Sequence, residues 1–168
     1  MDTKAKFQEM RADMYRDLGT HISTKATDRR VWKTLDVLLR IVSFGKLTDF
    51  MKRTTTLGRW IAFGEDVDLY NTGLYDLLTL RHERRHVIQR NKYTCLGLWL
   101  LYLFVPLPVG LAYFRYKFER EAVLDEIDYA KSLGLTLNIG DIISGLSGPS
   151  YVWMWPKKWI KKDLTKAA

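Results

Sequence analysis

A long uncharged stretch, residues 93–114, limits what this chain can fold into. It contains 22 residues without a charged side chain, which is long enough for one helix to span a bilayer. Pro106 and Pro108 interrupt the stretch, and each removes a backbone donor, so a continuous helix is disfavoured. We therefore expect a helix over 94–104, a turn, and a new helix from about Val109. Burial as the wall of a core is the favoured interpretation, and shallow membrane insertion or a true span are the alternatives.

The remaining pattern predicts mostly helices with one β segment. Residues 54–63 are rich in β-branched and aromatic side chains, and Gly64 follows them, so we expect a strand there. Apolar residues recur at helical spacing elsewhere. The helices expected from this spacing cover residues 7–18 before Gly19, 28–42 after a possible N-cap at Asp28, 74–91, 109–133 before Gly134, and 139–146.

The chemistry of the chain centres on the motif His82-Glu83-Arg84-Arg85-His86. Residues i and i+4 of a helix lie on the same face, so both imidazoles can reach one metal ion at about 2.0–2.1 Å. Glu83 is offset around the helix, where it could hold a zinc-bound water and take its proton. The pattern therefore predicts Zn²⁺ as the cofactor and Glu83 as the catalytic base.

A catalytic zinc ion needs a third protein ligand and an open position. No histidine follows His86, and His21 lies far upstream near a predicted helix end, where a surface or capping role is expected. The third ligand should therefore be a carboxylate, and the following helix offers Glu119, Glu121 and Asp125. A single membrane span over 93–114 would separate His86 from this helix by about 30 Å, so the span and the metal site exclude each other.

The segment from Thr79 to Gln89 and the later stretch Arg115-Tyr116-Lys117-Phe118-Glu119-Arg120-Glu121-Ala122 resemble the small gluzincins, which are HExxH zinc metallopeptidases. The resemblance covers roughly residues 54–133 and implies a zincin-like fold with an active-site helix pair. It also implies Glu119 as the third ligand, with Ala122 as the small residue at the helix contact. The alternative register is that of thermolysin-like enzymes, with Glu121 as ligand and Asp125 orienting a histidine. Unlike most members, this chain has arginine at both inner motif positions.

Composition and charge complete the expectations about organisation and partners. The length of 168 residues predicts one α+β, helix-dominated domain. Within it we expect N-terminal helices over 1–45, a metal-site core over 54–133 and a Trp/Lys-rich tail over 150–168.

The net charge of +8 comes without a nucleic-acid-binding motif, so no nucleic-acid partner is expected. The N-terminus lacks the apolar run of a signal peptide, which favours a cytoplasmic protein. Peripheral membrane contact is possible through 93–114 or 151–162.

Together these features predict zinc-dependent hydrolysis of a peptide or protein substrate. In this prediction the strand at 54–63 holds the substrate by edge pairing. The alternatives are a catalytically silent zincin-fold binding protein and a membrane-associated scaffold protein whose histidine pair is incidental.

Overall fold

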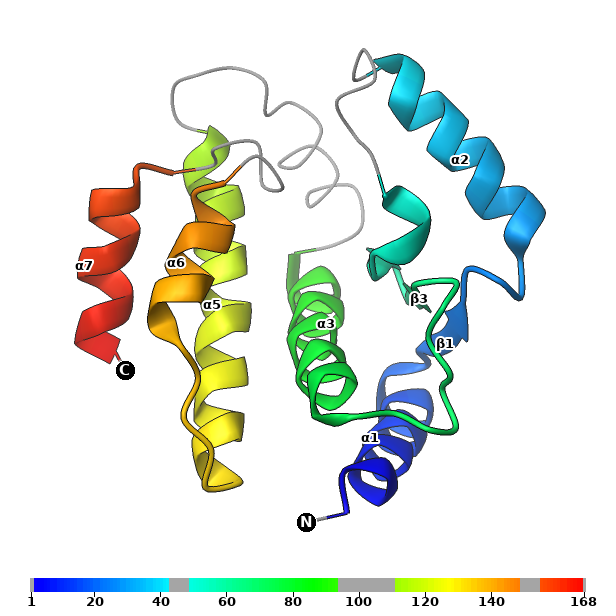
Figure 1. Cartoon of the computed structure of the whole chain (residues 1–168), viewed down its shortest axis with the longest axis horizontal. Helices are drawn as coiled ribbons and strands as arrows, with labels where there is room; N and C mark the ends of the chain where they lie inside the picture. Colours follow the sequence, from blue (N-terminus) through cyan, green and yellow to red (C-terminus); the bar gives the residue numbers. More distant parts are fainter. Residues whose placement is uncertain (1, 43–48, 94–110, 149–154, 168) are drawn as a thin grey trace. The chain divides into compact units, whose positions relative to one another are not determined.

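The computed structural model describes residues 2–42, 49–93, 111–148 and 155–167 (Figure 1). The described chain is dominated by helices and carries one small sheet, as expected for an α+β protein. It divides into two compact units, Met1–Leu80 and Arg81–Ala168. The division falls within the 54–133 segment that the sequence predicts as one metal-site core.

The first unit contains helix α1 (Thr3–Leu18), strand β1 (His21–Thr24), helix α2 (Arg29–Val42), the 3-10 helix η1 (Phe50–Lys52), and strands β2 (Thr55–Leu57) and β3 (Trp60–Phe63). The sheet order is β1-β3-β2, with β1 parallel and β2 antiparallel to β3. Helix α1 ends as expected at Gly19, which has a φ of 59° that favours glycine. Three residues of its predicted apolar face, Phe7, Met10 and Met14, are buried, and the Phe7 ring lies 5.7 Å from the Phe63 ring of β3.

The prediction of one strand over 54–63 is wrong in part. A turn containing Gly58, whose φ is 67°, divides this segment into the hairpin β2–β3. Strand β3 is paired on both sides in the described sheet, so the edge that segment 54–63 offers to an extended peptide belongs to β2. Strand β1 is the element that sequence patterning missed. Its four residues are too few to show a period, and they become a strand because β3 supplies the pairing partner.

The second unit contains the later part of helix α3 (Leu74–Tyr93), then helices α5 (Leu111–Ser132), α6 (Ile139–Leu146) and α7 (Lys157–Ala167). The predicted stop at Gly134 is confirmed by its φ of 74°, and α6 has the predicted bounds. Figure 1 shows α5, α6 and α7 side by side. Their shared core is apolar and includes Tyr116, Val123, Ile127, Ile143, Leu146, Ile160 and Leu164.

Helix α7 is a second element that the sequence did not predict. Lysines dominate its sequence and make the apolar pattern hard to recognise. Ile160 and Leu164, four residues apart on one helix face, are nevertheless buried. The Tyr116 hydroxyl of α5 donates to the Asp163 carboxylate at 3.0 Å, and the Tyr116 ring stacks on Trp155. These contacts fix the helix to α5.

Most of the uncharged segment 93–114, namely residues 94–110, lies outside the described residues, and so does the helix expected over 94–104. The helix expected from about Val109 corresponds to α5, whose described part begins at Leu111. Within the described parts of the chain, no helix combines the length and apolar character needed to cross a membrane.

Candidate metal centre

Three side chains from two helices of the second unit converge on one point. His82 and His86 lie on α3, and Glu119 lies on α5. The two Nε2 atoms are 3.1 Å apart, and Glu119 Oε2 is 3.4 Å from Nε2 of His82 and 3.5 Å from Nε2 of His86. In a tetrahedral site with metal–ligand bonds of about 2.0–2.1 Å, neighbouring ligand atoms are about 3.3–3.4 Å apart. The three atoms therefore have nearly the spacing that a tetrahedral metal ion requires.

Antiparallel contacts between α3 and α5 bring the three side chains together. Near one end of the site, the Arg81 guanidinium pairs with Asp125 at 2.8 Å. Near the other end, the Gln89 amide donates to the backbone carbonyl of Phe118 at 3.0 Å. Because residue numbers rise along α3 as they fall along α5, the helices run in opposite directions. Ala122, one turn from Glu119, is completely buried.

The centre is shielded from solvent and favours positive charge. The side chains of His82, His86 and Glu119 are only 12%, 15% and 6% exposed. Burial lowers the pKa of His82, but hydrogen bonds to Glu119 and Glu126 outweigh it and raise the pKa to about 10. Burial also lowers the pKa of His86, and the nearby Glu119 charge more than reverses that effect. Burial raises the pKa of Glu119, but the two imidazoles hold it well below its usual range.

The outer nitrogen of each imidazole has its own partner. His82 Nδ1 lies 3.2 Å from Glu126 Oε2, and His86 Nδ1 lies 3.0 Å from Gln89 Oε1. A carboxylate can only accept, so His82 donates its Nδ1–H to Glu126. This arrangement directs Nε2 toward the centre, as outer partners do in metal sites of proteins. The buried His-His-Glu group could hold a metal ion.

The other predicted site residues have different neighbours. Glu83 is half-buried on α3, and its charge contributes to the raised pKa of both histidines. Glu121, the alternative ligand, lies 3.1 Å from the Gln89 amide nitrogen and 3.6 Å from Arg85. It is outside the group of ligand atoms that converge with the two histidines.

Asp125, which would orient a histidine only in the alternative register with Glu121 as ligand, pairs with Arg81, and the neighbouring Glu126 contacts His82. Sequence reasoning missed Glu126 and Gln89. The spacing of each residue in the sequence could have identified it. Glu126 follows Glu119 by seven residues and therefore shares its helix face, and Gln89 follows His86 by three.

His21, the third histidine, is exposed on β1 in the first unit, in agreement with the expected surface role.

Comparison with protein-family models, curated proteins and solved structures found no significant match. The likeness to gluzincins therefore rests on the motif residues and not on an overall relative. The chemistry of the His-His-Glu group is the basis for a functional proposal.

Proposed function

We propose that this protein is a zincin-like, zinc-dependent peptidase that hydrolyses a peptide or protein substrate. His82, His86 and Glu119 hold the ion, and Glu83 is the general base. The observation that carries the proposal is the convergence of three ligand atoms at 3.1–3.5 Å from one another, together with the HExxH order of the residues on α3. Two imidazoles and one carboxylate form a donor set of catalytic zinc sites, which leaves a coordination position open.

The chain's own residues account for the remaining chemistry. Zinc, when bound, supplies Lewis-acid activation of water and of a substrate carbonyl. Glu83 follows His82 directly, so its carboxylate projects about 100° around the helix from that imidazole. There it can take a proton from the attacking water and pass it to the leaving amine. The burial of the centre strengthens these electrostatic interactions because little water screens them.

We expect one tightly bound zinc ion per chain, and we expect His86→Ala to lose most of it. Removing one of three ligands leaves a buried carboxylate and one imidazole, which hold the ion poorly. Elemental analysis after purification without chelator, followed by zinc titration, measures both values. His21→Ala is the matched control because His21 is exposed and lies in the other unit. Absence of zinc from the wild-type protein, with no uptake on titration, would contradict the proposal.

A metal-binding protein without turnover is the nearest alternative. Both functions require stoichiometric zinc, so metal content does not separate them. Turnover of a fluorogenic peptide library by the zinc-loaded protein does. A scaffold protein with an incidental histidine pair would bind no zinc at all.

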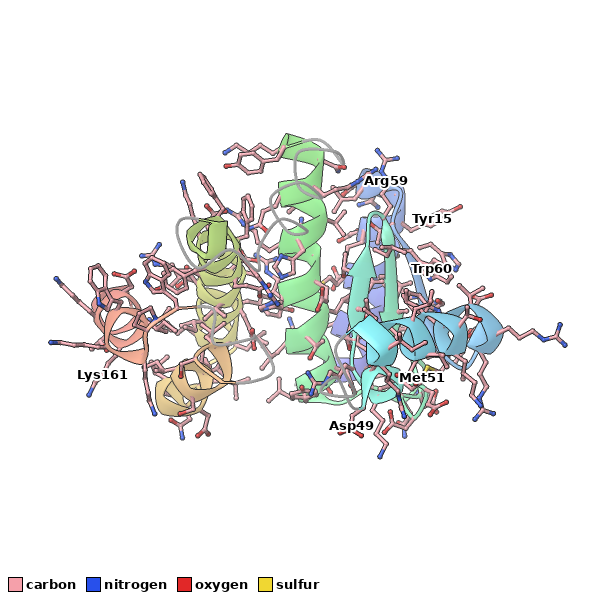
Figure 2. The ribbon with its side chains drawn as sticks, turned by 90° about the horizontal axis from the view of Figure 1, so that it is seen from above. Tyr15, Asp49, Met51, Arg59, Trp60 and Lys161 are labelled. Atoms are coloured by element: carbon pink, nitrogen blue, oxygen red, sulfur yellow. The ribbon has the colours of Figure 1, made fainter. Side chains whose placement is uncertain are left out.

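We also propose that α7 makes peripheral contact with an anionic membrane. Trp159 is 60% exposed, and four exposed lysines surround it in the sequence: Lys157, Lys158, Lys161 and Lys162. Figure 2 shows the Lys161 side chain extending away from the helix. Lysine clusters on amphipathic helices are attracted to anionic headgroups, and tryptophan favours the interface.

Changing Lys158, Lys161 and Lys162 together to glutamine should weaken binding to phosphatidylserine-containing vesicles by roughly 100-fold, at about 1 kcal/mol per lysine. Co-sedimentation with anionic and with neutral vesicles measures this effect. The matched control changes the exposed Lys4, Lys33 and Lys52 to glutamine, which removes the same charge elsewhere. Equal binding by both triple variants would mean that net charge alone drives the contact.

A further inference from the structure

We infer that Gln89 is the positioning residue of His86, and that Glu121 and Arg85 hold Gln89 in the orientation that this role requires. The inference rests on the proposed metal site. It gives a structural role to two features that the zinc mechanism leaves aside, the second glutamate of α5 and an arginine within the HExxH motif.

The Gln89 side chain is almost completely enclosed and all its polar atoms have partners. The residue is 3% exposed and lies one helical turn after His86. Its amide nitrogen is 3.0 Å from the Phe118 carbonyl oxygen and 3.1 Å from Glu121 Oε2. Its amide oxygen is 3.0 Å from His86 Nδ1. A glutamine placed only to fill space would not need three such contacts.

These partners determine which way the amide faces. A backbone carbonyl and a carboxylate accept hydrogen bonds and cannot donate them, so both must face the NH₂ group of Gln89. The amide oxygen is then the atom next to His86. Because that oxygen can only accept, His86 must carry a hydrogen on Nδ1, which leaves Nε2 available to face the centre. Turning the amide over would bring its oxygen against two other acceptors.

Arg85 explains how the Glu121 carboxylate can lie close to Gln89 and the centre. Its guanidinium is 3.6 Å from Glu121 Oε2, and both side chains are partly exposed. The positive charge compensates Glu121 and leaves it as an acceptor for Gln89. The contacts therefore form one series from Arg85 through Glu121 and Gln89 to His86. His82 is oriented differently, by direct contact with the Glu126 carboxylate.

The test uses Gln89→Met, which keeps the approximate length and removes both the oxygen and the nitrogen of the amide. Loss of an outer partner typically weakens metal binding 10–100-fold, and we expect a decrease in zinc affinity of that size in a chelator competition. Glu121→Gln keeps an acceptor for the Gln89 amide and should remain within about threefold of the wild type, whereas Glu121→Leu should weaken zinc binding measurably. Gln8→Met is the matched control, because Gln8 donates to a backbone carbonyl in the other unit.

A second readout, the Hδ1 resonance of His86 in ¹⁵N-resolved NMR of the metal-free protein, separates positioning from simple stability. The resonance should exchange slowly in the wild-type protein and broaden or disappear in Gln89→Met. Unchanged zinc affinity and an unchanged Hδ1 in that variant would overturn the inference, as would a decrease in Tm without either change. Wild-type protein that shows the protected Hδ1 but takes up no zinc would support the positioning of His86 and disprove the proposed peptidase function.

Discussion

Glu83→Gln is expected to keep one zinc ion per chain and to lower kcat by about 10²–10⁴-fold, the range typical of a lost general base. The substitution leaves His82, His86 and Glu119 in place, and an amide of the same shape cannot take a proton from water. Glu83 also acts on the centre electrostatically, because its charge raises the pKa of both imidazoles. Zinc content and turnover of a peptide library, measured on the same preparation, test the two halves of the prediction.

Glu9→Gln is the matched control for this experiment. Glu9 is exposed on α1 in the first unit, so it carries the same change without a neighbouring imidazole. Loss of zinc from Glu83→Gln, with zinc retained by the control, would show that Glu83 is itself a ligand. Full turnover with zinc retained would assign the base to another residue.

Glu119→Ala should weaken zinc affinity by at least about tenfold more than Glu121→Ala, the difference expected between a ligand and a residue outside the ligand shell. Residues two apart on a helix point about 160° apart, so only one of the two glutamates can face the histidines. Glu119 Oε2 lies within 3.5 Å of both Nε2 atoms, whereas Glu121 contacts Gln89 and Arg85. Competition with a chromogenic chelator gives both affinities.

The two glutamates serve as controls for each other, because they share one helix and differ in what they face. The reverse order of affinities would move the ligand to Glu121. Small and equal losses would show that neither is a ligand and would remove the basis for a three-ligand zinc site.

The parts of the fold and site that could be predicted from the sequence are those that depend on local periodicity. The pair His82 and His86 lies on one helix face because a four-residue spacing requires it. The amphipathic face of α1 and the stop at Gly134 follow from equally local rules. The third member, Glu119, was reached by resemblance, because spacing alone left Glu121 open.

What sequence reasoning missed depends on contacts between distant segments. Strand β1 exists because β3 pairs with it across more than 30 residues of chain, and its own four residues carry no pattern. The choice of Glu126 over Asp125 as the partner of His82 has a similar origin. Both are acidic neighbours on α5, and only the rotation of that helix against α3 decides which one meets His82 and which one meets Arg81.

The antiparallel pairing of α3 and α5 places every proposed ligand within one half of the chain, although His86 and Glu119 are separated by a long connecting segment. A metal ion bound at this point would crosslink α3 and α5 and close the segment between them into a loop. Such a crosslink lowers the conformational entropy of the unfolded chain. Occupancy would then be linked to the folding equilibrium of residues 81–168, the unit that contains all three proposed ligands. If the centre binds zinc as proposed, removing the metal with a chelator should lower the stability of this unit.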